Sequence, residues 1–167
     1  GENGVDSAHF PFLHSQQTKK MRTDAIEIDG TTFVHRTFQY YNVFGLAKLM
    51  VPEVSGPLDV TLYGLGCVVN RTVVDAKLKL FYTFAFYFTP VDEEHTEVTN
   101  MLTMRKMPMP FANRVLLRKA ITEGKKTIDQ DVPIWENKIY RDRPVLCEGD
   151  GPIMQYRRWA AQFYEAP

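Results

Sequence analysis

The amino-acid sequence predicts an α+β fold in which an antiparallel sheet packs against long helices. Segments with strand character come first along the chain, and the long helical segments follow them. That order is typical of α+β proteins rather than of alternating α/β folds. A length of 167 residues is natural for one domain, so residues 1–167 are expected to form a single domain.

The strand predictions rest on alternation of apolar and polar residues and on the turn residues that bound each segment. They cover residues 25–30, 31–41, 58–63, 67–69, 76–89 and 95–106. The strongest is 76–89, whose even positions are Leu78, Leu80, Tyr82, Phe84, Phe86 and Phe88. Because side chains alternate along a strand, this even set shares one face. We expect that face to pack on a helix or to line an apolar cavity.

Helical spacing of apolar residues predicts the remaining elements. A helix is expected over 111–126, continuing over 128–139 with a disturbance at Pro133, and a terminal helix over 153–164. The polar, basic stretch 16–22 is predicted to be a mobile connector.

Composition excludes two classes of function. Twenty basic and twenty acidic residues cancel, which leaves no electrostatic case for binding nucleic acid. The longest apolar run covers the nine residues 80–88, whereas a membrane helix needs about 20. No membrane span is therefore expected in this chain.

Two histidines near the start of the chain, His9 and His14, point to a metal site. Neutral imidazoles are good ligands for iron, zinc and copper. The two cysteines, Cys67 and Cys147, are too few and too far apart for a cysteine-rich zinc site. An open site of imidazoles and carboxylates remains. The alternative is that both histidines belong to the core beside a short aromatic helix.

The spacing of these histidines requires a break in the helix. Residues five apart on an α-helix point about 140° away from each other. Pro11 lies between His9 and His14 and disfavours a continuous helix. We therefore expect a helix up to about His9 and an irregular turn that brings His14 back.

Asp131, which stands among apolar residues after a helical run, is a candidate for the third ligand. A buried carboxylate is costly unless it is paired or bound to a cation. The alternative is a solvated acid beside a kink at Pro133.

Together these residues resemble the iron-binding motif of Rieske non-haem iron oxygenases. The pattern Asp6-x2-His9-x4-His14, with Asn3 before it, matches the first half of that motif, and the Asp131-x4-Glu136 spacing matches the second. The stretch 134–164 resembles the 3-ketosteroid 9α-hydroxylase oxygenase branch, to which the animal cholesterol 7-desaturases are near relatives.

The resemblance implies a helix-grip domain of the Bet v 1 and START type, with the sheet wrapped around a long C-terminal helix. It implies a mononuclear Fe(II) held by His9, His14 and Asp131, with positions open for O2. Asp6 would link His9 to the Rieske cluster of an adjacent subunit, and Asn3 would lie near the iron.

A steroid or sterol would be the substrate, and the aromatic face of strand 76–89 is the candidate wall of its pocket. The substrate-binding residues predicted there are Tyr82, Phe84 and Phe86.

The resemblance also implies partners. Electrons would come from NAD(P)H through a reductase, directly or by way of a ferredoxin, and the protein would be a homotrimer. A [2Fe–2S] Rieske cluster needs cysteine and histidine in close pairs. Neither Cys67 nor Cys147 has such a neighbour, so a Rieske domain is expected upstream of residue 1. A cytoplasmic location is expected, with a membrane anchor in that upstream part left open.

Several functions compete on this evidence. Hydroxylation of a steroid, as in the 3-ketosteroid 9α-hydroxylases, leads. Sterol 7-desaturation by the same family is the alternative, and a non-catalytic sterol- or lipid-binding module is a further one. A hydrolytic zinc enzyme could use the same three ligands.

Overall fold

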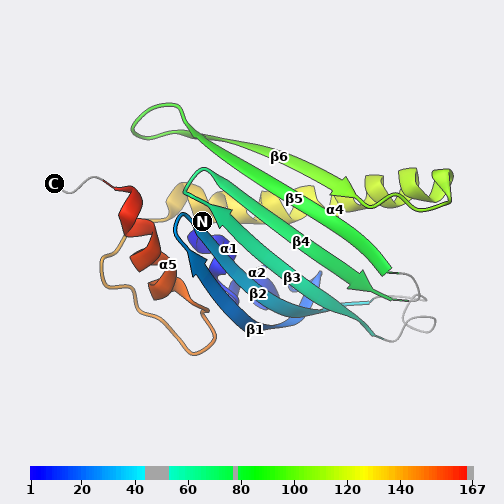
Figure 1. The fold of residues 1–167 in the computed structure, drawn as a ribbon, viewed down its shortest axis with the longest axis horizontal. Helices are drawn as coiled ribbons and strands as arrows, with labels where there is room; N and C mark the ends of the chain where they lie inside the picture. Colours follow the sequence, from blue (N-terminus) through cyan, green and yellow to red (C-terminus); the bar gives the residue numbers. More distant parts are fainter. Residues whose placement is uncertain (44–52, 77–78, 165–167) are drawn as a thin grey trace.

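The computed structural model describes residues 1–43, 53–76 and 79–164. Within them the chain forms a six-stranded antiparallel sheet in which sequential strands are neighbours, β1-β2-β3-β4-β5-β6 (Figure 1). The strands are β1 Thr18–Asp29, β2 Thr32–Tyr41, β3 Val54–Tyr63, β4 Cys67–Asp75, β5 Lys79–Pro90 and β6 Thr96–Met104.

One long helix, α4 (Pro110–Asn137), crosses one face of this sheet, and the short helices α1 (Glu2–Val5) and α2 (His9–Leu13) lie over the same face (Figure 1). Helix α5 (Ile153–Ala160) and a 3₁₀ turn (Ala161–Phe163) close one end. The predicted α+β class, with an open antiparallel sheet against a long helix, is confirmed.

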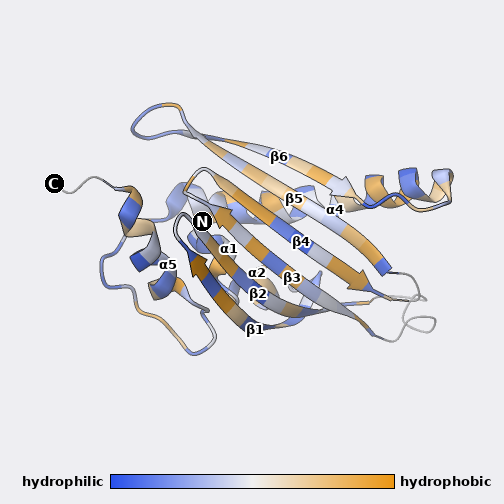
Figure 2. Ribbon diagram, in the orientation of Figure 1, coloured by the Kyte–Doolittle hydropathy of each residue, from blue (hydrophilic) through white to orange (hydrophobic). Residues whose placement is uncertain are grey.

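The densest core lies where α5 meets the sheet. Phe33 of β2 is fully buried and packs against the rings of Tyr156 and Trp159. The indole N–H of Trp159 donates to the carbonyl oxygen of Gly30 at 2.9 Å, which fixes α5 to the β1–β2 turn. The hydrophobic residues along the central strands alternate with polar ones, as Figure 2 shows. The core therefore follows from period-two patterning against one amphipathic helix.

The alternation predicted for residues 76–89 is present in β5. Val68, Asn70 and Thr72 of β4 pair with Phe86, Phe84 and Tyr82, respectively. Side chains of paired residues point to the same face, so these aromatic rings share a wall with the even residues of β4. Leu78 lies outside the described residues.

The prediction of a connector over 16–22 is wrong, because β1 begins at Thr18. Arg22 pairs with Phe38 and Thr18 with Tyr41, at the edge of the sheet. An edge strand is held by backbone hydrogen bonds on one side and exposes much of its surface to water, so it needs no apolar pattern. Polar composition alone therefore concealed it.

The disturbance predicted at Pro133 does not end the helix, since α4 continues to Asn137. The prediction for the first residues is also partly wrong. His9 begins a helix rather than ending one, and Pro11 falls in its first turn. The N–H that proline lacks would be unbonded there in any case, so proline is tolerated.

No helix in the described part of the chain is both long and apolar enough to cross a membrane.

Candidate metal centre and its cavity

The segment that carries the two histidines is shaped by Asp6. Asp6 ends α1 in an extended conformation, with φ −75° and ψ 103°. Its carboxylate Oδ1 accepts hydrogen bonds from the backbone N–H groups of Ala8 (2.9 Å) and His9 (3.2 Å). Aspartate in this position satisfies amides that a helix start leaves free. Asp6 therefore sets where α2 begins and with it the position of His9.

Each imidazole is oriented by a bond to its Nδ1 atom. His9 Nδ1 lies 2.6 Å from the backbone carbonyl oxygen of Asp6, and His14 Nδ1 lies 2.9 Å from Oε1 of Gln130. Since both partners are acceptors, each Nδ1 carries a hydrogen, and in the neutral ring each Nε2 keeps its lone pair. Metal-binding histidines are oriented in this way.

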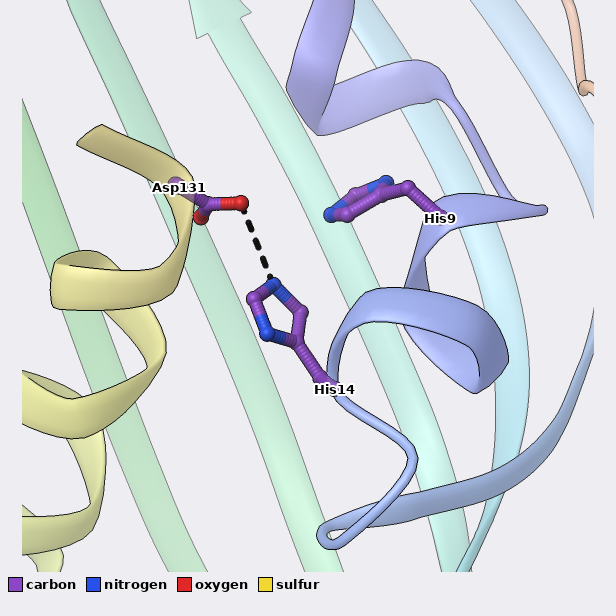
Figure 3. A group of neighbouring side chains, drawn as sticks. All are labelled: His9, His14 and Asp131. Atoms are coloured by element: carbon purple, nitrogen blue, oxygen red, sulfur yellow. Dashed lines mark ion pairs between the residues drawn. The ribbon is translucent and has the colours of Figure 1, made fainter. Parts of the chain in front are cut away.

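The structure brings His9, His14 and Asp131 together, as Figure 3 shows. One ligand atom from each lies within 4.8 Å of the others. Nε2 of His14 and Oδ1 of Asp131 are 3.3 Å apart. His14 is the residue after α2. Its N–H still donates to the carbonyl oxygen of Phe10 at 3.0 Å, and the chain leaves the helical path at His14 itself, with φ −101° and ψ 34°. The prediction of an irregular turn between the two histidines is wrong: helix α2 runs from His9 to Leu13, because proline is tolerated in the first turn of a helix.

Two atoms of this group are buried without a hydrogen-bond partner among the described residues, His14 Nε2 and Asp131 Oδ1. Asp131 is only 6% exposed. When His14 is neutral, these two acceptor atoms face each other at 3.3 Å with nothing between them, which costs free energy. A cation would satisfy both atoms at once. Two imidazole nitrogens and one carboxylate oxygen are the donor set typical of non-haem Fe(II), so the residues fit iron.

The two histidines differ in proton affinity. Burial lowers the pKa of His9, which keeps its ring neutral near pH 7. Burial also acts to lower the pKa of His14, but Asp131 and Gln130 outweigh it, and that pKa is raised. A metal ion would displace the proton of His14, because ligation requires the neutral ring.

A cavity of about 720 Å³ adjoins the three residues. Phe84 and Phe86 of β5 form part of one wall, and Ile128 and Trp135 of α4 face it. That volume falls within the range of small-molecule sites, which are mostly apolar with few polar groups. The three candidate ligands open onto this space.

Two sets of polar groups in the cavity wall differ in how they are bonded. One set is internally bonded: Gln39 donates to the Tyr41 hydroxyl at 2.8 Å, which lies 2.8 Å from the hydroxyl of Thr72. The other set comprises Gln17 Oε1 and Asn70 Oδ1, which are buried with no partner among the described residues. These two oxygens are free to accept a hydrogen bond from a ligand.

The other predicted site residues are also at the cavity or next to it. Asn3 on α1 lines it, as do Tyr82, Phe84 and Phe86. Asp6 contacts the His9 ring through its backbone carbonyl, whereas its carboxylate Oδ2 is 4.0 Å from Nδ1 of His9.

Sequence reasoning missed Gln130, Gln17, Asn70 and Gly124, all of which lie at the cavity or hold its ligands. For Gln130 a signal existed. It stands directly before Asp131, and a long amide one position from a candidate ligand can reach a neighbouring imidazole. Signals also existed for two others: Asn70 is a polar residue in an apolar strand, and Gly124 is a glycine within a helical pattern.

Comparisons with known proteins place the chain in a family. A family described as "3-Ketosteroid 9alpha-hydroxylase C-terminal domain" matches residues 1–164. The chain is 53% identical over 198 residues to the cholesterol 7-desaturase of Caenorhabditis elegans, covering 98% of the chain and 41% of that protein. It is 26% identical over 168 residues to a probable 3-ketosteroid-9-alpha-monooxygenase oxygenase component of Rhodococcus rhodochrous, covering 98% and 42%.

A solved structure supports the fold. Dicamba monooxygenase bound to 3,6-dichlorosalicylic acid superposes with a TM-score of 0.59 at 14% identity, over 96% of this chain and 53% of that one. At that identity the likeness concerns the fold alone. The chain spans less than half the length of the curated relatives it matches.

Proposed function

Since this chain belongs to the 3-ketosteroid 9α-hydroxylase C-terminal domain family, we propose that it is the catalytic domain of a Rieske-type oxygenase. It oxidises a steroid-like substrate at a mononuclear Fe(II). The observation that supports this most strongly is the meeting of His9, His14 and Asp131 beside an apolar cavity, with two of their donor atoms otherwise unpartnered.

The roles of the residues follow from their contacts. His9, His14 and Asp131 hold the iron, which when bound supplies the activation of O2. The Asp6 carbonyl and the Gln130 amide hold the two imidazoles in the ligating tautomer. The aromatic wall of β5 and the facing side of α4 exclude water and hold a flat apolar substrate against this centre.

We assign the carboxylate of Asp6 a separate role. Its Oδ1 bonds the amides of α2, and the side chain is 28% exposed, so Oδ2 is accessible to a partner. In this proposal Asp6 links His9 to the [2Fe–2S] cluster of a neighbouring subunit in a trimer, with electrons supplied from NAD(P)H through a reductase or ferredoxin. Asp6→Asn should keep the iron and lose turnover. Wild-type turnover in this variant would contradict the proposed role of Asp6 in electron transfer.

Two reaction outcomes remain, and similarity favours one. The relative at 53% identity is named a cholesterol 7-desaturase, whereas the one at 26% is named a 9-alpha-monooxygenase component. We therefore place desaturation of a sterol ahead of hydroxylation of a 3-ketosteroid, reversing the order that the sequence motifs gave. A sterol carrier is disfavoured, because it has no use for three converging metal ligands.

The mass of the product tests the proposal. The full-length oxygenase, loaded with Fe(II) and supplied with a reductase, is given cholesterol and a 3-ketosteroid in separate reactions. Loss of two hydrogens indicates desaturation, and gain of one oxygen indicates hydroxylation. An Asp131→Ala variant serves as the control without a complete iron site. Sterol binding without any product, in a protein shown to hold iron, would favour the carrier instead.

A further inference from the structure

Gly124 is an unusual residue for its position. It lies within the 28-residue helix α4, where glycine is about 1 kcal/mol less favourable than alanine in general. A Cβ atom added there would lie 2.8 Å from Cε1 of the Phe84 ring and 3.6 Å from its Cζ. The absence of a side chain is therefore what allows this ring to lie against the helix backbone.

This contact crosses the cavity. Phe84 comes from β5 and Gly124 from α4, and both line the same space. At a rise of 1.5 Å per residue, Gly124 lies about 10 Å along α4 from Asp131. Ala120 lies about 6 Å beyond Gly124, away from Asp131. Lining residues occur on both sides of the contact: Ile128 towards Asp131, and Ala120 away from it.

The lining residues beyond the contact contribute mostly apolar surface. Val74, Ala120 and the ring of Tyr82 contribute apolar surface there. The Thr72 hydroxyl donates to the carbonyl of Pro57 at 3.1 Å, and the Glu123 carboxylate is paired with Lys126 at 2.9 Å. A group that occupies this part gains by burying apolar surface, as an aliphatic chain does.

We propose that the Phe84–Gly124 contact determines substrate length. It separates an iron-proximal part of the cavity, which takes the fused rings, from a distal part that takes the aliphatic side chain of a sterol. This inference rests on the proposed function and adds to it a preference for substrates that carry such a chain.

Gly124→Ala tests the inference, because the added methyl forces the Phe84 ring to shift. The measurement is binding of two probes to the iron-loaded full-length protein: cholesterol, and androst-4-ene-3,17-dione, which has no side chain. Fluorescence of Trp135, which lines the cavity, reports binding. Gly124→Ala should weaken cholesterol binding about tenfold, the lower range for one methyl group in an apolar pocket, and leave the binding of the shorter probe within twofold.

A second substitution checks the cause. Phe84→Leu removes the ring atoms nearest to Gly124, so Gly124→Ala should be nearly neutral in that background. Such coupling is expected only for residues in contact. Thr122→Ala, on an exposed position of the same helix, is the matched control and should alter neither probe.

The outcomes separate this inference from the proposed function. If the wild type binds both probes and Gly124→Ala leaves their affinity ratio unchanged, the length filter is wrong while the steroid assignment stands. If the wild type binds neither probe, the substrate class is wrong and the inference fails with it. An equal effect of Gly124→Ala with and without the Phe84 ring would also overturn the filter.

Discussion

The proposed iron end of the site, formed by His9, His14 and Asp131, and the aromatic wall of the cavity are built in different ways. The wall is part of a sheet in which Phe84 and Phe86 are held by a continuous backbone ladder to β4. The candidate ligands come instead from the two ends of the chain and are held by a few individual bonds, such as His9 Nδ1 to the Asp6 carbonyl. Changes to ligand side chains should therefore affect the metal with little effect on the fold, whereas changes to their supports should affect stability.

The largest effect is expected from His9→Ala and His14→Ala. Each removes one of three donors, so the purified protein should retain almost no iron while its circular dichroism stays close to that of the wild type. Iron content per chain is the measurement. His95→Ala is the matched control, because His95 is exposed in the β5–β6 turn and, among the described residues, its side chain bonds only Asp92. Full iron content in both His9→Ala and His14→Ala would contradict the assignment of these residues as iron ligands.

The sequence singled out His9, His14 and Asp131, the three residues that the structure brings together. His9 and His14 stand close together in the sequence, whereas Asp131 comes from the distant helix α4. Asp131 was identified by its apolar neighbours. The start of α2 was not predicted. It depends on which backbone N–H groups donate hydrogen bonds to the Asp6 carboxylate, and those bonds form only in the folded chain.

The second prediction concerns His35, which supports the iron end from the sheet. It is fully buried, and its Nε2 lies 2.9 Å from the Thr23 hydroxyl, which in turn is 3.3 Å from Ser7. Burial lowers the pKa of His35 to about 4 from an ordinary 6.5. The unfolded chain therefore binds this proton at a higher pH than the folded one. Stability from this residue is present above about pH 6.5 and is lost as the pH falls towards 4, by roughly 3 kcal/mol.

Urea unfolding between pH 7 and pH 4 measures this loss. His35→Gln has no titrating group at this position, so its stability should fall less steeply over the same interval, even though the variant starts from a lower value. His95→Gln, exposed at the sheet edge, should keep the wild-type slope. Identical slopes for His35→Gln and the wild type would contradict the assignment.

Strands and helices could be predicted where burial of one face makes apolar residues recur at a regular spacing. They could not be predicted where backbone hydrogen bonds or close backbone contacts determine the structure. The apolar residues at even positions of β5 predicted both the strand and the face that points into the cavity. The edge strand β1 has no such pattern over 18–22, because pairing with β2 needs only its backbone. Close approaches such as Gly151 to Val5 join segments far apart in sequence and leave no periodic trace.

Gly151 gives the third prediction. Its φ is +78°, and an added Cβ would lie 2.3 Å from the carbonyl oxygen of Val5, at the end of α1. Gly149 also has a positive φ, +102°, but an added Cβ would meet nothing within 4 Å. Both alanine variants are strained, and only Gly151→Ala must also displace backbone. We expect it to lower the free energy of unfolding by about 2 kcal/mol more than Gly149→Ala. Equal losses would mean that the loop can move away without cost.

The smallest effect is expected from Gln130, where the fold is untouched and only the orientation of one ligand changes. Gln130→Leu removes the acceptor for Nδ1–H of His14, so the ring is no longer held in the ligating tautomer. Loss of such a support typically lowers metal affinity by about 10- to 100-fold, and we expect the lower end, about 1.4 kcal/mol, because His9 and Asp131 remain. Competition with a chelator measures the affinity.

Two variants serve as controls. Gln130→Glu keeps an acceptor oxygen and should bind iron as the wild type does. Gln155→Leu controls for an added leucine on an exposed helix position. Equal losses in Gln130→Leu and Gln130→Glu would show that the amide acts by packing rather than by accepting the imidazole hydrogen.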